Sequence, residues 1–297
     1  MNLVDITTMF PTDERCREIL TRLRWPEGVR CPRCNMDVVE LETEKTLYYC
    51  KQCNYQFTVT AGTIFNDSHL PLTKWFMATL LLCEAKKGMS ACQIQRTLGL
   101  GSYKTAWYLC HRIRAAMTES QQTMLDGKVE MDETYVGGKV LGQGKFAGWA
   151  NKEVVVGIRK RGGELRFFHA KDARSGTLAK YIQENLSEDL DILYTDDAKQ
   201  YRSAAKHLRQ TRRHKTIRHS MKIYVKGDIH TNTVESAFSL LKRGIMGSWH
   251  RVSAKHLQAY CTEMAFRFNR RKRSDLFTDT LRHMVTAPVL TFEKLTA

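Results

Sequence analysis

Two pairs of cysteines near the start of the chain restrict its fold more than any other feature. Cys31 and Cys34 enclose two residues, as do Cys50 and Cys53, and fifteen residues separate the pairs. Each pair can form a tight knuckle with both sulfurs about 2.3 Å from a metal, and a hairpin between the knuckles closes the tetrahedron. The spacing predicts a four-thiolate zinc ribbon with one structural Zn²⁺, because no coordination position is left open. The alternative, a redox pair, needs a single C-x-x-C in a thioredoxin-like βαβ context.

The remaining cysteines and the apolar runs bear on the compartment. Nine cysteines are an odd number, which argues against a disulfide framework. No run reaches the roughly 18 apolar residues of a membrane span, and the N-terminus lacks the basic and apolar regions of a secretory signal. We therefore expect a cytoplasmic protein with no membrane partner. The cysteines outside the two pairs are predicted to be buried small hydrophobes: Cys16, Cys83, Cys92, Cys110 and Cys261.

Net charge points to a polyanionic partner. Lys and Arg number 47 against 31 Asp and Glu, so the formal net charge is +16. Such a field favours DNA or RNA, although a ribosome-associated or merely basic protein has the same composition. Residues 198–227 contain no acidic residue, and residues 242–273 contain only Glu263. Charge runs are usually solvated faces, but these two could hold a phosphate backbone.

Helical spacing dominates the first part of the chain after the N-terminus. Residues 11–24 predict a short helix with Thr12 at its cap, and residues 72–87 predict an amphipathic helix closed by Gly88. Ser90 is placed to cap a second helix that runs to about residue 98.

A third helix is predicted at residues 103–117, after a short turn that contains two glycines. Two helices joined in this way, with the second one basic, resemble a helix-turn-helix whose recognition helix enters the major groove. On this interpretation Lys104, Arg112 and Arg114 contact double-stranded DNA, with His111 on the same basic helix. The alternative is plain packing of three helices.

From Gly127 the apolar period changes from 3.6 to 2. Strands are predicted at residues 128–136, 153–161 and 164–171, followed by a helix from Ser175 to about residue 186 and a strand at 191–196. Further helices and a short strand follow. The order strand, strand, strand, helix, strand, helix, short strand, helix is that of the RNase H-like fold, with a mixed sheet flanked by helices.

Three acidic residues fall where that fold presents metal ligands. Asp132 lies on the first strand, Asp196 ends the fourth, and Glu235 lies on a late helix. Cleaving or transferring a phosphodiester calls for two divalent ions, and carboxylates suit Mg²⁺ or Mn²⁺. Asp132 would bridge both ions, and the other two acids would each complete one. A lone acid at a strand end is more often a turn or cap residue. Glu133 is excluded because its side chain points to the opposite face, whereas Asp197 could substitute in part for Asp196.

The segment from His230 to His250 predicts a helix that carries Glu235 in its first turn and Lys242 seven residues later, on the same face. Thr231 or Asn232 could cap it, and Leu240, Leu241 and Ile245 could anchor it. The alternative is an ordinary amphipathic surface helix. The residues of this segment predicted to contact DNA or phosphate are His230, Asn232, Lys242 and Arg243, with Asp228 as a neighbour of the site.

These features together resemble the bacterial insertion-sequence transposases of the DDE type, with an N-terminal zinc ribbon and an RNase H-like (ISXO2-like) domain. The motifs that carry the resemblance are RWPEGVRCPRC, TAGTIF, LPLTKWF, KTAWYLCHRIR, VEMDETYVGGK, YTDDAKQY, HTNTVESAFSLLKRGI and FRFNRR. The resemblance implies Asp132, Asp196 and Glu235 as the catalytic triad, with Lys242 as the basic residue that follows it. It also implies a nucleoid-associated enzyme that acts on terminal inverted repeats, as a homodimer or larger assembly on paired DNA ends.

The expected chain is multidomain, of α+β and α/β class. We expect a helix and zinc ribbon at 1–65, a helix-turn-helix region at 66–124, a catalytic domain at 125–273 and a tail at 274–297. Two other functions remain open: an RNase H-like nuclease or resolvase that cuts without joining, and a DNA-binding regulator with an inactive core.

Overall fold

The computed structural model describes residues 2–37, 39–42, 47–119, 122–137, 152–208, 213–217, 225 and 227–297. The chain folds into two compact units, one of residues 1–118 and 270–297 and the other of residues 119–269. The segment from residue 274, expected as a tail, therefore belongs to the first unit. None of the helices in the described ranges is long and apolar enough to cross a membrane.

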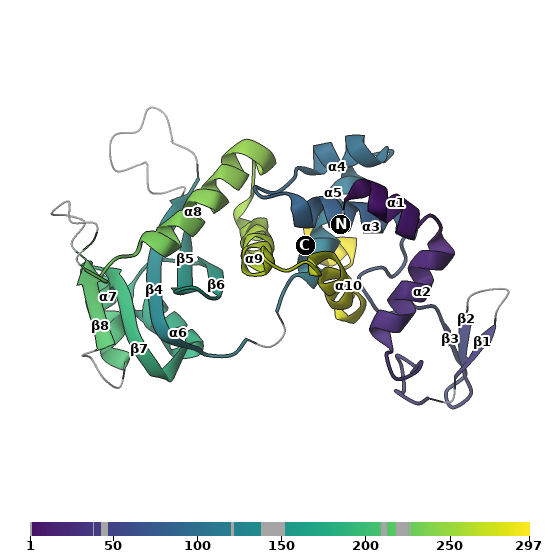
Figure 1. Ribbon diagram of the computed structural model, residues 1–297, viewed down its shortest axis with the longest axis horizontal. Helices are drawn as coiled ribbons and strands as arrows, with labels where there is room; N and C mark the ends of the chain where they lie inside the picture. The colour runs from purple at the N-terminus through teal and green to yellow at the C-terminus, as the bar shows by residue number, and fades with distance from the viewer. Residues whose placement is uncertain are drawn as a thin grey trace. The chain divides into compact units, whose positions relative to one another are not determined.

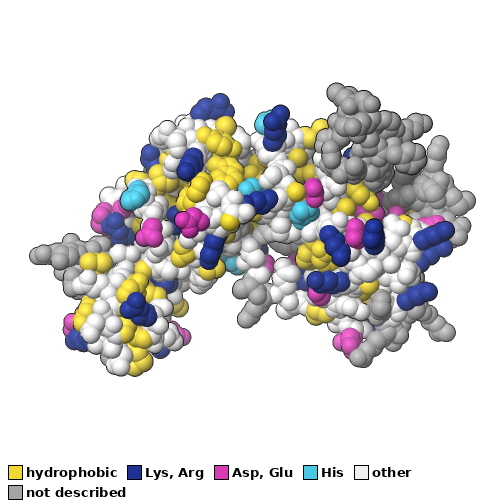
Figure 2. Space-filling view, turned by 180° about the vertical axis from the view of Figure 1, so that it is seen from behind, with side chains coloured by type: hydrophobic (Ala, Val, Ile, Leu, Met, Phe, Trp, Pro, Cys, Tyr) yellow, Lys and Arg dark blue, Asp and Glu magenta, His cyan; other side chains and the backbone are white. Residues whose placement is uncertain are grey.

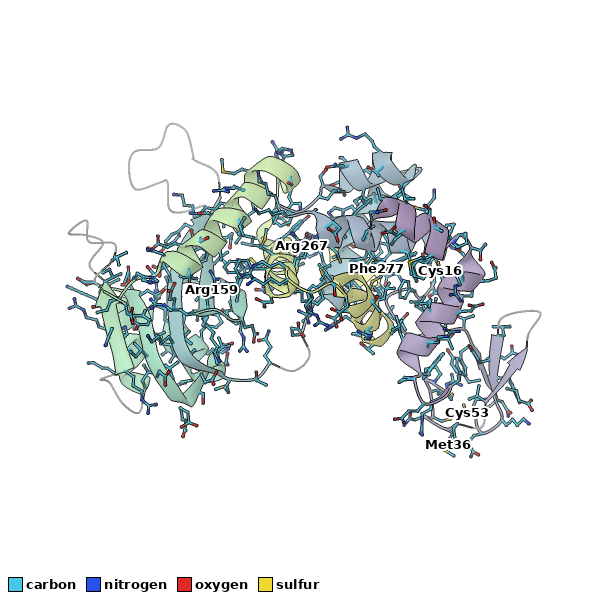
Figure 3. The ribbon with its side chains drawn as sticks, viewed as in Figure 1. Cys16, Met36, Cys53, Arg159, Arg267 and Phe277 are labelled. Atoms are coloured by element: carbon cyan, nitrogen blue, oxygen red, sulfur yellow. The ribbon has the colours of Figure 1, made fainter. Side chains whose placement is uncertain are left out.

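Helices form most of the first unit, with α10 packed among those of the N-terminal part (Figure 1). Phe10 and Phe277 both contact the ring of Phe76, at centroid distances of 5.0 and 5.8 Å. The side chain of Cys16, on α2, is also buried; Cys16 and Phe277 are labelled in Figure 3. The described helices of this unit are α1 (Leu3–Met9), α2 (Asp13–Arg24), α3 (Leu72–Glu84), α4 (Ala91–Leu98), α5 (Tyr103–Ala116), α10 (Leu276–Thr286) and α11 (Phe292–Thr296).

The predicted helices of this unit are confirmed with two corrections, and one prediction of a buried cysteine is wrong. Helix α1 was not predicted, and it begins with a capping box between Asn2 and Asp5. Helix α3 ends at Glu84 rather than residue 87, because Ala85 already has an extended backbone and Gly88 closes the next turn instead. Cys92 is exposed, unlike the other four cysteines predicted to be buried.

A three-stranded antiparallel sheet is formed by β1 (Val39–Glu42), β2 (Leu47–Cys50) and β3 (Tyr55–Phe57). One cysteine pair precedes β1, and the other lies at the end of β2 and in the turn that leads to β3. The amides of Asn35 and Asn54 donate to the carbonyls of Cys31 and Cys50, at 2.8 and 2.9 Å. Both asparagines have positive φ, which turns each knuckle tightly.

The four sulfurs lie close together without forming disulfides. Cys31 and Cys53 have their sulfurs 3.6 Å apart, and so do Cys34 and Cys50. A disulfide needs about 2.05 Å. A tetrahedron with Zn–S bonds of about 2.3 Å has edges of about 3.8 Å. The cluster therefore fits one structural zinc ion, as the spacing predicted.

The second unit is built on a five-stranded mixed sheet in the order β6-β5-β4-β7-β8 (Figure 1). β4 pairs antiparallel with β5 and parallel with β7. The predicted order of elements is confirmed, although β7 begins at Leu186 rather than at the predicted Asp191. The strands are β4 (Leu125–Val136), β5 (Glu153–Lys160), β6 (Leu165–Ala170), β7 (Leu186–Asp196) and β8 (His214–Ile217), and the helices are α6 (Ser175–Asn185), α7 (Lys199–Ala204), α8 (Asn232–Gly244) and α9 (Ala254–Arg270).

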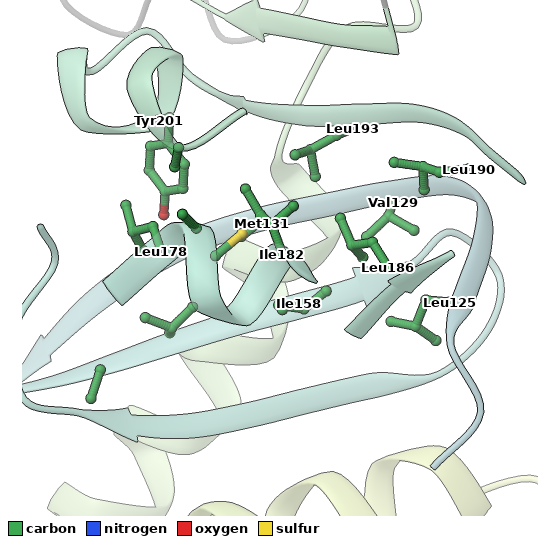
Figure 4. Packing of buried hydrophobic residues seen from close by; sticks show 14 of the residues in the cluster. Leu125, Val129, Met131, Ile158, Leu178, Ile182, Leu186, Leu190, Leu193 and Tyr201 are labelled. Atoms are coloured by element: carbon green, nitrogen blue, oxygen red, sulfur yellow. The ribbon is translucent and has the colours of Figure 1, made fainter. Parts of the chain in front are cut away.

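The two faces of this sheet bury different helices. Val129 and Met131 of β4 pack with Leu178 and Ile182 of α6, and with Tyr201 of α7 (Figure 4). The opposite face packs on α8 and α9, in a cluster formed by residues such as Val155, Phe167, Val234, Phe238 and Leu241. Because side chains alternate along a strand, the even-numbered residues of β4 lie on the α8 face.

Helix α8 packs closely on the sheet at Gly157, the β5 partner of Asp132. A Cβ atom placed on Gly157 would lie 2.7 Å from Phe238 and 2.8 Å from Val234. We therefore expect Gly157→Ala to push α8 outward and to lower the free energy of unfolding by about 1–3 kcal/mol, measured by urea denaturation. Gly176→Ala is the control, because its Cβ meets nothing within 4 Å. An unchanged unfolding midpoint for Gly157→Ala would contradict this packing.

The zinc ribbon predicts a metal-dependent stability. Purified protein should contain one zinc ion per chain, and Cys34→Ser should lose it together with the folded ribbon, because structural zinc contributes on the order of 10 kcal/mol to such domains. Zinc content by atomic absorption and limited proteolysis of residues 25–60 test this. Cys92→Ser should change neither, since Cys92 lies outside the cluster. Full zinc occupancy in Cys34→Ser would refute the four-thiolate site.

Candidate active site

Strand pairing places two of the predicted acids at one end of the sheet. Glu130 of β4 pairs with Tyr194 of the parallel strand β7. Asp132 and Asp196 each lie two residues beyond that pair, so they stand level on neighbouring strands. Neighbouring strands are about 4.8 Å apart.

The third acid, Glu235, lies in the first turn of α8, as predicted. Val234 and Phe238 on the same helix flank Gly157, which is the β5 partner of Asp132. The Thr231 hydroxyl donates a 2.7 Å hydrogen bond to Oε1 of Glu235 and so orients that carboxylate. The helix thus brings a carboxylate to the sheet face that carries Asp132.

The acids around Asp132 affect its pKa. Its pKa is raised well above the ordinary value, first by burial and then by repulsion from Glu133, Asp196 and Glu235. Each neighbouring negative charge disfavours ionisation of Asp132. Asp196 and Glu235 are therefore both close enough to Asp132 to disfavour its ionisation.

The three carboxylates do not converge on one point. Within the described ranges, the four cysteines are the one group of potential ligands whose donor atoms all lie within 4.8 Å of one another. A site for two ions about 3.5–4 Å apart allows the wider spacing. Two carboxylates that hold different ions can lie farther apart than two ligands of a single ion.

The neighbouring acids have other partners. Glu133 accepts a 2.5 Å hydrogen bond from the hydroxyl of Tyr201, which belongs to the cluster on the opposite face of the sheet. Asp197 pairs with Arg202 at 2.9 Å. Asp228 pairs with Lys128 at 3.0 Å. These contacts separate them from Asp132, Asp196 and Glu235, although the charge of Glu133 still raises the pKa of Asp132.

The start of α8 corrects a prediction and adds a residue. Thr231 occupies the N-cap position, but its side chain makes no hydrogen bond to the helix amides. Asn232 is the first helical residue and does not cap the helix either. The capping acceptor is Glu130 of β4, which binds the amides of Thr233 and Val234 at 2.9 and 3.0 Å. The position of Glu130 two residues before Asp132, on the same face of the predicted strand, is the sequence signal that could have pointed to it.

The residues predicted to contact DNA on α8 occupy different environments. His230 is half-buried, with Nδ1 3.2 Å from Oε1 of Glu130. Asn232 is exposed at the start of the helix, and Lys242 and Arg243 are exposed in its last turn. The exposed side chains can reach a ligand, whereas the ring of His230 faces the carboxylate of Glu130.

The helix-turn-helix prediction needs a correction in its contact residues. Helices α4 and α5 and the glycine turn between them form as predicted, with Gly99 in the left-handed region. However, Arg112 and Arg114 are only 3% and 2% exposed. Arg112 donates to the carbonyl of Asn66, so it packs inside its own unit and offers no surface for phosphate. Lys104 is exposed, with its ammonium group 4.2 Å from the ring centre of Phe292.

Basic side chains are spread over both units on the face shown in Figure 2, with acidic side chains among them. The first basic run, 198–227, falls partly outside the described residues, since 209–212, 218–224 and 226 are not among them. In the described part, Arg213 donates to the carbonyl of Glu188.

The donor set of the candidate site indicates the class of metal that it suits. Asp132, Asp196 and Glu235 offer only carboxylate oxygens, and burial together with mutual repulsion raises the pKa of Asp132. Oxygen ligands of this kind suit hard divalent cations such as Mg²⁺ or Mn²⁺, and a bound cation would relieve the repulsion.

Comparison with known proteins gives matches to both parts of the chain. The family of the ISXO2-like transposase domain matches residues 124–269, and that of the transposase zinc-ribbon domain matches residues 11–56. A relative from Halobacterium salinarum, described as an uncharacterized protein in transposable element ISH50, is 30% identical over 272 residues, which cover 84% of this chain and 89% of the relative. The first match covers the five-stranded sheet with α8, and the second covers the cysteine cluster. The chain belongs to the family of ISXO2-like transposases that carry a transposase zinc ribbon.

Proposed function

We propose that this protein is a DNA transposase that binds the terminal inverted repeats of its own insertion sequence, cleaves them and joins the ends to target DNA. The observation that carries the proposal is the crowding of Asp132 by Asp196 and Glu235 at one end of the sheet, in a chain of this family. A protein that only binds DNA has no use for repelling carboxylates beside a polyanion.

The chemistry follows from the placement of the acids. Divalent ions bound there would activate the attacking oxygen and stabilise the leaving oxygen of the phosphodiester. Asp132, between the other two acids in the fold, would contribute to holding both ions, while Asp196 and Glu235 would each contribute to one. The hydroxyl of Thr231 holds the carboxylate of Glu235 by a 2.7 Å hydrogen bond, which limits its rotation.

DNA binding would use exposed cations near this site and in the first unit. Lys242 and Arg243 lie at the far end of the helix that carries Glu235, and on this proposal they would contact a phosphate or a terminal base pair. Of the three residues predicted to contact DNA from the recognition helix, Lys104 at the start of α5 is the exposed one. Because one active site reaches one DNA end, joining a pair of ends calls for a dimer or larger assembly.

A gel assay tests the proposal directly. Labelled DNA with the element's ends and a supercoiled target are incubated with wild-type protein and Mg²⁺ or Mn²⁺. We expect metal-dependent nicking and joined product, both lost in Glu235→Gln. Asp197→Asn is the matched control, because Asp197 pairs with Arg202. Nicking without joined product would favour the nuclease, and binding without nicking would favour the regulator.

The raised pKa of Asp132 predicts an effect of pH on stability. A carboxyl whose pKa is higher in the folded than in the unfolded chain favours folding at low pH, and this contribution is lost as pH rises through the folded pKa. Without Mg²⁺ or Mn²⁺, Asp132→Asn should therefore raise the melting temperature at pH 8 but not near pH 4. With either ion present, the same substitution should abolish nicking.

Asp126→Asn serves as the control of opposite sign in that melting experiment. A hydrogen bond from Lys160 lowers the pKa of the exposed Asp126, so this substitution should give no gain at pH 8. A melting temperature for Asp132→Asn at or below that of the wild type at pH 8 would contradict the crowding of the carboxylates.

A further inference from the structure

Glu130 is a buried carboxylate that the proposed chemistry does not use. Its side chain is 0% exposed, on the face of β4 that carries Asp132 two residues later. Its Oε2 accepts hydrogen bonds from the amide of Thr233 (2.9 Å), the hydroxyl of Thr233 (2.7 Å) and the amide of Val234 (3.0 Å). The first amides of an α-helix have no partner within the helix. A side chain of the sheet therefore provides the cap of α8.

The other oxygen of Glu130 binds Arg161, in the turn that joins β5 and β6. Arg161 donates from Nε to Oε1 of Glu130 at 2.7 Å. Its two terminal nitrogens donate to the carbonyls of Asp228 and His230, each at 2.8 Å. The same guanidinium lies 4.0 Å from the ring centre of Tyr194, two residues before Asp196. Arg161 therefore ties the segment that leads into α8 to both strands that carry the acids.

A second arginine supports the same point from β5. Arg159, labelled in Figure 3, donates to the carbonyl of Thr233 and stacks on the ring of Phe268. Thr233 is thus held through its amide, hydroxyl and carbonyl by side chains of the sheet.

We propose that Glu130 and Arg161 act as a clamp that fixes the first turn of α8, and with it Glu235, against Asp132 and Asp196. A cap from the helix's own N-terminal residue satisfies amides but leaves the helix free to shift over the sheet. A cap from the strand that carries Asp132 sets the distance between Asp132 and Glu235, because Asp132 is two positions after Glu130 and Glu235 is one or two positions after the amide partners of Glu130. Both clamp residues are positioning residues.

A metal ligand is a different role for Glu130, and its contacts argue against it. Four hydrogen bonds already occupy its two oxygens. A role in stability alone is also a weaker explanation for the pairing of Glu130 with Arg161, because the desolvation of a buried ion pair offsets most of its attraction. When the two partners of such a pair belong to separate elements, the pair fixes the position of one element relative to the other.

The proposed clamp rests on the proposed function. Its test compares Arg161 with Arg166, two arginines of the hairpin formed by β5 and β6. Arg161→Lys and Glu130→Gln should each weaken Mn²⁺ binding by about 10-fold, measured by electron paramagnetic resonance on the full chain without DNA, since residues that orient metal ligands have effects of that size. Arg166→Lys is the matched control. Arg166 binds Glu164, Asn185 and the carbonyl of Thr123, and none of these lies on α8.

We expect a loss of Mn²⁺ affinity in Glu130→Gln and Arg161→Lys but not in Arg166→Lys. The melting temperatures of the three variants should fall by comparable amounts. Wild-type affinity in Glu130→Gln, or an equal loss in Arg166→Lys, would overturn the clamp. Nicking as a function of Mg²⁺ concentration gives a parallel readout, in which added Mg²⁺ should partly restore the rate of the clamp variants.

Hydrogen exchange separates failure of the clamp from failure of the proposed function. If Asp132→Asn leaves Mn²⁺ binding unchanged, the carboxylates are not the metal site and the proposed function fails. The clamp is then judged on exchange of the amides of Thr233 and Val234, which should be about 10-fold faster in Glu130→Gln and unchanged in Arg166→Lys. Unchanged exchange in Glu130→Gln would refute the clamp whatever the metal result.

Discussion

The close packing of α8 on the sheet at Gly157 is the contact on which the candidate active site depends. A side chain at that position would meet Phe238 and Val234, so the helix lies close to β5 only because glycine leaves room. The same approach brings the amides of Thr233 and Val234 within reach of Glu130. A larger gap would leave one oxygen of Glu130 and two helix amides without these hydrogen bonds, each at a cost of about 1–3 kcal/mol.

Charge is distributed unevenly along β4. Glu130 has its negative charge balanced by Arg161, whereas Asp132, two residues later on the same face, is surrounded by further acids. On the proposals made above, Glu130 would fix geometry, and a bound cation would favour the ionised form of Asp132.

The sequence was informative wherever the signal was local. Cysteine spacing, the period-2 runs and the caps at Ser90 and Thr12 each depend on neighbours in the chain, and they predicted the ribbon, the order of strands and several helices. The capping of α8 could not be read in this way, because its acceptor lies about a hundred residues upstream. The basic residues of α5 misled for the same reason: the spacing of Arg112 gives its helical face, but only the tertiary contacts with Asn66 and Trp75 decide that this face is interior.

The division of the chain has a consequence for its synthesis. The first unit is made of residues 1–118 and 270–297, with the sheet-containing unit inserted between them. Phe277 of α10 packs against Phe10 and Phe76, so the aromatic core of the helical unit stays incomplete until α10 has left the ribosome. The five-stranded sheet and α8 precede α10 in the chain. On the nascent polypeptide, the unit with the candidate carboxylates can therefore assemble before the core of the helical unit is closed.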